Sequence, residues 1–363
     1  MATTTATTTP AKPVTNTLSA GRLPKPAPWA LLALCLLIMA GVFTLIWMGD
    51  TTGDFNIAAT VFLGVALYAV VIYVASRLVE GARRAADRLV TTLVSLAFVI
   101  ALLPLISLIF TVITRGLARF DIEFFTFSMR NIVGAGGGAV HAITGTLLIT
   151  LAASLISIPV GLMTSIYLVE YGRGRLARAI TFFVDVMTGI PSIVAGLFAY
   201  ALFAILLGPG VRLGIIGAIA LSVLMIPVVV RSSEEMLRLV PNELREAAYA
   251  LGVPKWLTIT KVVLPTAIGG IMTGVMLSIS RVIGETAPLL VAAGFTANMN
   301  YNLFDGRMQS LPVYVYTNYV SQGTDAAASV DRAWAGALTL IIIVMLLNLV
   351  ARIIAKIFAP KSR

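Results

Sequence analysis

The chain has 363 residues, of which 59% are hydrophobic and only 12% charged, and its mean hydropathy is +0.97. Soluble domains carry about 25% charged residues, so this composition predicts an all-α polytopic membrane protein. The net charge of +10 does not indicate nucleic-acid binding, because the Lys and Arg residues fall in short clusters between apolar runs. One cysteine, Cys35, and one histidine, His141, exclude a disulfide framework and a thiolate or histidine-pair metal site.

The first 28 residues, MATTTATTTPAKPVTNTLSAGRLPKPAP, are rich in Thr, Ala and Pro and offer little apolar surface to bury. This composition predicts a disordered cytoplasmic tail. A signal peptide is not indicated, because the next apolar run is about 20 residues long and has no clear A-x-A cleavage site.

Apolar runs long enough to cross a membrane follow one another through the rest of the chain. A transmembrane helix needs about 20 apolar residues to cross the hydrocarbon core. Eight runs meet this condition, and an even number places both termini on the same side of the membrane. The predicted spans are 29–48, 55–76, 89–113, 141–169, 178–207, 213–231, 264–295 and 333–357.

The distribution of Lys and Arg between the spans predicts the orientation. With the N-terminus in the cytoplasm, 19 of the 26 Lys and Arg residues fall in cytoplasmic segments and six in outer segments, while Arg281 lies within a span. Cytoplasmic loops of membrane proteins carry an excess of Lys and Arg, so both termini are predicted to be cytoplasmic. The same orientation places residues 246–265 in the cytoplasm.

Two of the predicted spans are longer than the bilayer requires. At about 1.5 Å per residue, a straight helix over 264–295 would reach about 48 Å, against about 30 Å of hydrocarbon. Gly284 and Pro288 indicate a kink or an interruption in its outer half. The run 141–169 contains Pro159, and we expect it to bend or to extend out of the bilayer.

The segment EAAYALGVPKWLTITKVVLP, residues 246–265, is mixed and polar although it lies between strongly apolar runs. Pro241 suits the first turn of a helix, Gly252 suits a helix end, and Pro254 opens a second helix that leads into the next span. The first helix has an apolar face made of Leu244, Ala247, Ala248 and Leu251. Its small alanines suit close approach by another protein. The alternative, a helix on the lipid headgroups, fits less well because the polar face has few Lys or Arg.

The same loop carries a pattern that is found in a known family. The pattern consists of Glu246, Ala247, Ala248, Gly252, Val262, Leu264 and Pro265. It resembles the cytoplasmic E-A-A loop of permease subunits of binding-protein-dependent ABC importers, with Val262 where the family often has Ile. The resemblance implies that the first helix of the loop docks on an ATP-binding partner subunit and relays its closure to the spans.

Further stretches resemble the PstA type of phosphate-importer permease. They are VDVMTGIPSIVAGLFAY (184–200), VRSSEEMLRLVPNELREAAYALG (230–252) and SRVIGETAPLL (280–290). The E-A-A loop alone is specific only to the superfamily, whereas GETAPLL and TGIPSIVAGLF are much more specific. The resemblance covers about residues 89–357 and implies a six-span core of the type I ABC importer fold.

The first 88 residues depart from the six-span pattern of the family by adding a tail and two spans, and the resemblance implies a set of partners for the permease domain. A disordered tail (1–28) and two extra transmembrane helices with a cytoplasmic linker (29–88) would precede the permease domain (89–357). This domain would contain the cytoplasmic coupling loop (232–265), and a short cytoplasmic tail (358–363) would follow it. The partners would be a second, PstC-type permease, two PstB-type ATP-binding subunits, an outer phosphate-binding protein and the lipid bilayer, with no nucleic acid. This chain would hold no cofactor, because ATP would bind to the partner ATPases.

Arg281 and Glu285 are charged residues within a predicted span, where ionisable side chains are costly and usually functional. A separation of four residues would place them on one helical face. Arginine suits a phosphate oxyanion because it is always charged and donates two parallel N–H bonds. We expect Arg281 to contact the anion and Glu285 to orient Arg281 and weaken binding; similar permeases have an Arg and a Glu here that are implicated in moving phosphate. The alternative is a buried ion pair that locks this span to a neighbour.

Three further features have mainly structural explanations. Asp185 is an intramembrane acid that reaches the headgroup layer, pairs with a nearby Arg, or acts in transport. The glycines at 134 and 136–138 follow no predicted strand, so they indicate a flexible loop or an outer-surface element rather than a nucleotide site. Gly270 and Gly274 have the small-xxx-small spacing of closely packed helices.

The sequence contains no G-x-x-x-x-G-K-[ST], CxxC or HExxH motif and no Ser or Cys nucleophile with a plausible His base. We therefore expect a non-enzymatic permease subunit of an ATP-driven phosphate importer in the bacterial cell membrane. One alternative is a permease for another oxyanion, sulfate or molybdate. The other is an ion-coupled secondary transporter or channel, which predicts inverted repeats that the sequence does not show.

Overall fold

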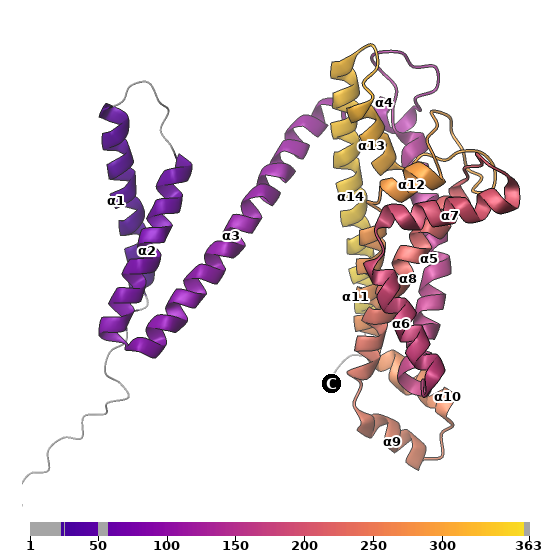
Figure 1. The fold of residues 1–363 in the computed structure, drawn as a ribbon, viewed down its shortest axis with the longest axis horizontal. Helices are drawn as coiled ribbons and strands as arrows, with labels where there is room; N and C mark the ends of the chain where they lie inside the picture. Colours follow the sequence, from indigo (N-terminus) through magenta and orange to yellow (C-terminus); the bar gives the residue numbers. More distant parts are fainter. Residues whose placement is uncertain (1–22, 25, 50–56, 359–363) are drawn as a thin grey trace, which may run out of the picture. The chain divides into compact units, whose positions relative to one another are not determined.

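A computed structural model describes residues 23–24, 26–49 and 57–358, and these residues form helices and connecting segments without a strand (Figure 1). The chain divides into two compact units, residues 1–108 and 109–363. The division falls inside helix α3, Ala82–Gly116. Most of the predicted tails, residues 1–22 and 359–363, lies outside the described residues.

The N-terminal unit contains α1 (Ala27–Gly49), α2 (Ile57–Val79) and most of α3, up to Leu108. Helices α1 and α2 pack against each other, and they correspond to the first two predicted spans. Only Glu80 and Gly81 separate α2 from α3. Gly81 has a φ of +91°, a conformation that glycine adopts without steric cost, so the chain turns sharply here.

The permease unit, residues 109–363, contains the remaining helices. They are α4 (Ile122–Thr126), α5 (Val140–Ile166), α6 (Arg175–Gly189), α7 (Ser192–Leu207), α8 (Gly214–Arg238), α9 (Asn242–Ala250), α10 (Lys255–Thr258), α11 (Leu264–Val282), α12 (Ala287–Ala292), α13 (Leu311–Val320) and α14 (Ala326–Phe358). Short π-helical segments follow α5 at Tyr167–Tyr171 and precede α11 at Ile259–Val263.

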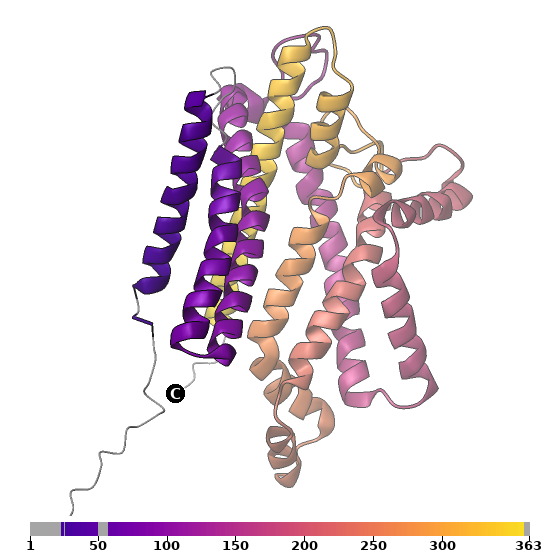
Figure 2. The ribbon, with the colours of Figure 1, turned by 60° about the vertical axis from the view of Figure 1, so that its left-hand side comes forward.

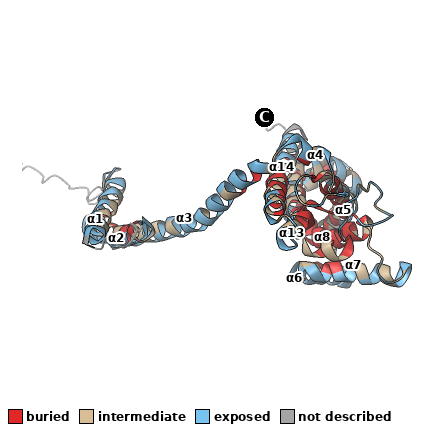
Figure 3. Ribbon diagram, turned by 90° about the horizontal axis from the view of Figure 1, so that it is seen from above, coloured by how far each residue is buried: buried red, intermediate tan, exposed pale blue. Residues whose placement is uncertain are grey.

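Helix α8 is the centre of the permease unit and contacts α5, α6, α7, α11 and α12. Buried residues concentrate on α8 and its neighbour α5, as Figure 3 shows. The predicted close packing of α11 is confirmed. A Cβ at Gly270 would lie 2.1 Å from the Sδ of Met236, and a Cβ at Gly274 would lie 2.3 Å from the Oγ of Ser232. Glycine therefore lets the backbone of α11 approach α8 closely.

Seven described helices are long and apolar enough to cross a membrane, or eight if α6 and α7 count as one broken span. The predicted span 178–207 is not one helix, because α6 and α7 meet at an angle of 110°. The break falls at Ile190 and Pro191. Proline disfavours a helical conformation in the residue before it, and Ile190 is accordingly extended, with a ψ of 129°.

Of the two overlong predicted spans, 264–295 is interrupted and 141–169 is not. The predicted interruption of 264–295 is confirmed, because α11 ends at Val282 and α12 begins only at Ala287. By contrast, α5 runs through Pro159 without a break and continues into the π-helical segment.

The end of the permease unit opposite α9 is held by a buried arginine on α14. Arg332 is 4% exposed and donates hydrogen bonds to the carbonyl oxygens of Gly134 (2.7 Å) and Gly136 (3.0 Å). Both glycines have positive φ, +85° and +87°. The glycine-rich segment is therefore a packed surface element rather than a loose loop. Nearby, His141 near the start of α5 is buried with its Nε2 3.3 Å from the Oε1 of Gln309.

Candidate functional site

Helix α9 has the boundaries that the sequence predicted. It follows Pro241 and ends at a Schellman motif, in which the N–H of Gly252 bonds the carbonyl of Tyr249 (2.9 Å) and the N–H of Val253 bonds that of Ala248 (3.1 Å). Gly252 has a φ of +76°, which this motif requires. The second helix, α10, begins directly after Pro254, as expected.

The apolar residues around α9 face outward rather than into the helical bundle. Figures 1 and 2 show α9 beyond the ends of α8 and α11. Of the predicted apolar face, Ala248 is buried, whereas Leu244 is 41% and Leu251 84% exposed. Tyr249 and Trp256 are also exposed, at 42% and 62%. Exposed apolar residues of this kind leave α9 and α10 available for contact with another protein.

An ion pair that the sequence did not predict anchors α9 to the end of α5. The Nε and Nη2 of Arg245 donate to the Oε1 of Glu170 at 3.0 and 2.9 Å, and the two side chains are only 12% and 5% exposed. Arg245 also donates to the carbonyls of Leu237 (3.0 Å), in the last turn of α8, and Val240 (2.6 Å), just beyond it. Lys255 adds a hydrogen bond to the carbonyl of Glu170.

Two π-helical segments contact α9. Glu170 belongs to the first, Tyr167–Tyr171, and the second, Ile259–Val263, contacts α9 and leads into α11. π-Helical turns are rare and occur frequently at functional sites. These two segments therefore connect α9 to α5 and to α11.

A charged network joins α6 to α8 near the same end. Arg231 on α8 bonds Asp185 on α6, so the predicted pairing of Asp185 with an arginine is confirmed. Arg231 also bonds Glu234 at 3.0 Å, and Glu234 bonds Arg238 at 2.6 Å. Among the described residues, no cluster of three or more His, Cys, Asp or Glu side chains is placed to hold a metal ion.

The two most specific sequence motifs meet in space. Gly196 of TGIPSIVAGLF lies on α7 and Pro288 of GETAPLL lies on α12, and a Cβ at Gly196 would lie 2.5 Å from the Cα of Pro288. Each motif also contains a helix break. Broken backbone at membrane depth is tolerated only where protein or a water-filled cavity surrounds it, so this contact indicates a region shielded from lipid.

The expectation that Arg281 and Glu285 share a helical face is wrong. Helix α11 stops at Val282, and Glu285 lies in the break before α12, with its N–H bonded to the carbonyl of Val282 at 3.1 Å. These two described side chains form no ion pair within 4.0 Å. Arg281 is exposed on the surface of this chain, and Glu285 is half-buried.

Comparisons with known proteins identify the family. Residues 157–363 match the family described as "Binding-protein-dependent transport system inner membrane component". The chain is 47% identical to "Phosphate transport system permease protein PstA 1" of Mycobacterium tuberculosis over 77% of this chain and 91% of that one. It is 41% identical to "Phosphate transport system permease protein PstA" of Pasteurella multocida over 77% and 97%.

A solved structure shares the fold at low sequence identity. The crystal structure of a bacterial alginate ABC transporter contains a chain that is 13% identical, with a TM-score of 0.53 over 76% of this chain and 96% of that one. The multiple apolar helices and these relatives show a multi-pass inner-membrane protein with the type I ABC permease fold. This chain therefore belongs to the family of binding-protein-dependent transport system inner membrane components, among its PstA-type permeases.

Proposed function

We propose that this chain forms half of the transmembrane pathway of an ATP-driven importer of inorganic phosphate, and that separate subunits hydrolyse the ATP. The observation that carries the proposal is the identity of 47% to a phosphate transport permease over 91% of its length. The contact between TGIPSIVAGLF on α7 and GETAPLL on α12 supports it, because the most specific motifs form one region.

The proposed coupling site is α9 with its anchor. Glu246 and Ala247 are exposed, so a charged contact and close approach by an ATPase subunit are both available. Ala248 packs inward and Gly252 makes the turn that returns the chain to the membrane. When the ATPases close, the displacement of α9 passes through Arg245 to α5 and switches the pathway between inward-facing and outward-facing states.

Arg281 and Glu285 are the proposed pathway residues. A charged side chain facing the centre of the lipid costs about 2.5–3.5 kcal/mol or more. Arg281 is exposed on this chain, so a second permease subunit covering α11 would remove it from lipid and place it in the pathway between the two subunits. There the guanidinium would bind the phosphate oxyanion, while the carboxylate in the helix break would limit the affinity.

The proposed complex contains a PstC-type permease, two PstB-type ATP-binding subunits and an outer phosphate-binding protein. Both termini would be cytoplasmic, with α6 and α7 counted as one broken span. The tail 1–28 and the extra helices of 29–88 would be additions to a permease domain at 89–357. No cofactor would bind to this chain itself.

The proposal is tested by uptake of labelled phosphate in cells that have no other phosphate importer. Uptake at low micromolar phosphate should require the gene and should be lost with Arg281→Gln. Arg281→Lys, which keeps the charge but not the bidentate geometry, should keep a part of it. Competition by excess sulfate or molybdate, or full uptake in the deletion strain, would overturn the assignment of phosphate.

A second pair of variants tests the coupling site separately. Glu246→Ala should reduce both uptake and ATPase activity of the purified complex, because the docking contact is weakened. Glu243→Ala is the matched control, since it removes an exposed acid from the first turn of the same helix. Equal effects of the two substitutions would contradict a specific role for Glu246.

A further inference from the structure

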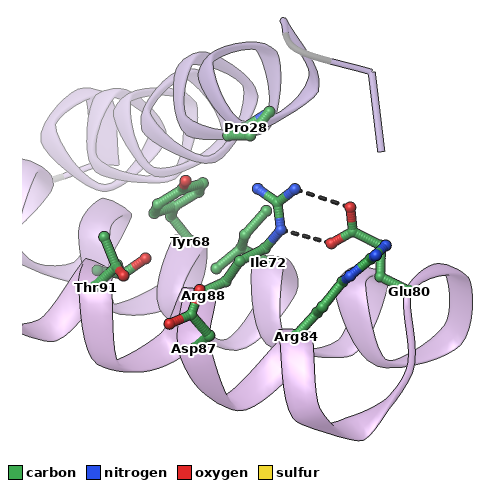
Figure 4. Close-up of a pocket in the computed structure, with 9 residues that line it drawn as sticks. Pro28, Tyr68, Ile72, Glu80, Arg84, Asp87, Arg88 and Thr91 are labelled. Atoms are coloured by element: carbon green, nitrogen blue, oxygen red, sulfur yellow. Dashed lines mark hydrogen bonds and ion pairs between the residues drawn. The ribbon is translucent and has the colours of Figure 1, made fainter. Parts of the chain in front are cut away.

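The N-terminal unit contains a cavity whose lining includes none of the proposed pathway or coupling residues. It has a volume of about 560 Å³ and is lined by residues of α1, α2, α3 and the α2–α3 turn, including Pro28, Tyr68, Glu80, Arg84, Asp87 and Arg88 (Figure 4). All of its lining residues belong to the unit of residues 1–108. Its lining combines two arginines, two acids and hydroxyl groups, which suits a polar, charged ligand.

The cavity is built around a fixed ion pair. Arg88 donates from Nε and Nη2 to the two carboxylate oxygens of Glu80, at 2.6 and 2.9 Å (Figure 4). Glu80 also accepts from the N–H of Leu23 and the hydroxyl of Ser76, both at 2.8 Å, and its side chain is 1% exposed. Glu80 thus holds the guanidinium of Arg88 in place at the cavity, and a guanidinium has further N–H groups for another acceptor.

An apolar groove continues from this cavity between the same three helices. The groove has a volume of about 500 Å³ and shares Pro28, Tyr68, Thr91 and Thr92 with the polar cavity. Its other lining residues are mainly apolar and include Trp29, Leu32, Leu36, Val65, Leu96 and Val99. A polar chamber and an apolar groove therefore meet at shared residues.

The face of α3 that lines both spaces changes steadily in character along the helix. Arg84 and Arg88 come first, the hydroxyls of Thr91 and Thr92 follow, and Leu96 and Val99 line the groove beyond them. At about 1.5 Å per residue, this face extends over about 22 Å. A charged headgroup, an ester region and an acyl chain of a phospholipid follow one another in the same order.

We infer that this unit binds one phospholipid with a zwitterionic, ethanolamine-type headgroup in the polar cavity and an acyl chain in the apolar groove. The phosphodiester accepts hydrogen bonds from Arg84 and Arg88, and the primary ammonium donates to Asp87. Two acids and two arginines line the cavity, so their formal charges sum to zero. A headgroup that itself has no net charge therefore fits the cavity. The site does not depend on the proposed transport function.

The test uses the tryptophan at the groove as a reporter. Full-length chains that keep only Trp29 or only Trp47, with the other tryptophans changed to Phe, are placed in phosphatidylcholine vesicles. These vesicles contain a small fraction of phosphatidylethanolamine, phosphatidylglycerol or phosphatidylcholine with brominated acyl chains, which quench nearby tryptophan. Brominated phosphatidylethanolamine should quench Trp29 several-fold more than Trp47, the reference at the other end of α1.

Substitutions then identify the headgroup contacts. Arg84→Gln should lower the affinity for phosphatidylethanolamine about tenfold or more, because a charge-assisted hydrogen bond is lost. Asp87→Asn should remove the preference for ethanolamine over choline. Arg83→Gln, next to the site but outside the lining of the cavity, is the matched control. Equal quenching of Trp29 and Trp47 by all three lipids, or a preference for phosphatidylglycerol, would overturn the inference, and neither result depends on the headgroup substitutions.

Discussion

Replacement of Arg245 by Met should loosen the contact between α9 and the segment that follows α5. The guanidinium makes two hydrogen bonds to Glu170 and two to carbonyls in and just beyond the last turn of α8, all within 2.6–3.0 Å. Removal leaves the carboxylate of Glu170 buried without its partner, for which the expected cost is about 3–5 kcal/mol. Glu170→Gln keeps an acceptor oxygen and leaves the carbonyl bonds in place, so it should cost less, about 1.5–3 kcal/mol.

A double-mutant cycle measures this pair directly. The free energy of unfolding of the purified chain is compared for Arg245→Met, Glu170→Gln and the double variant, and we expect the double variant to cost about 1–3 kcal/mol less than the sum of the singles. Exchange of the two residues should not restore stability, because a glutamate at 245 would face two carbonyl acceptors and has no donor. Additive single effects, or rescue by the exchange, would refute the anchor.

Three further predictions concern packing, the loop turn and pH. Gly274→Ala should lower the melting temperature by an amount equivalent to about 1–3 kcal/mol, because the added methyl group overpacks the α8–α11 contact. Gly269→Ala is the control and should cause no such loss, because the space around its Cβ position is open. Similar losses in the two variants would contradict the α8–α11 packing. Gly252→Ala should cost about 1–2 kcal/mol through its positive φ, measured in the same assay, and no loss would contradict the Schellman motif. Hydrogen bonds from Arg88 lower the pKa of Glu80 to about 2. The ion pair should therefore stabilise the fold fully above about pH 4.5, and this stabilisation should be lost as the pH falls through 2. In an acid titration of the helix content, Glu80→Gln should abolish this transition.

The local features of the coupling loop could be predicted because short-range chemistry determines them. Pro241 cannot continue a preceding helix, Gly252 accepts the left-handed conformation, and Pro254 starts a new helix. The structure places α9 and α10 at these boundaries. The spacing of Gly270 and Gly274 likewise predicted a close helix contact, although the partner, α8, was not predictable from spacing alone.

Features that depend on residues distant in the sequence could not be predicted. Glu170 and Arg245 are 75 positions apart, and nothing in the local pattern around either residue indicates that they meet. The pairing of Arg281 and Glu285 failed for a different reason. A helical spacing of four has meaning only if the helix continues, and α11 ends between the two residues. The nearby Gly284 indicated an interruption, so the two predictions were in conflict within the sequence itself.

The coupling role that we propose for α9 sets a free-energy requirement on the contacts that hold this helix. A shift of a two-state pathway from 1:99 to 99:1 requires about 5.5 kcal/mol of differential interaction. If the contacts between α9 and the rest of the permease unit were weaker than this free energy, a displacement of α9 would break them. The helix α9 would then detach while the spans stayed in place. One neutral hydrogen bond contributes about 1 kcal/mol, whereas loss of a buried ion-pair partner costs about 3–5 kcal/mol. Under the proposed coupling, displacement of α9 would therefore be carried by the Arg245–Glu170 pair acting together with the burial of Ala248 and the bond from Lys255, and not by any one of these contacts alone.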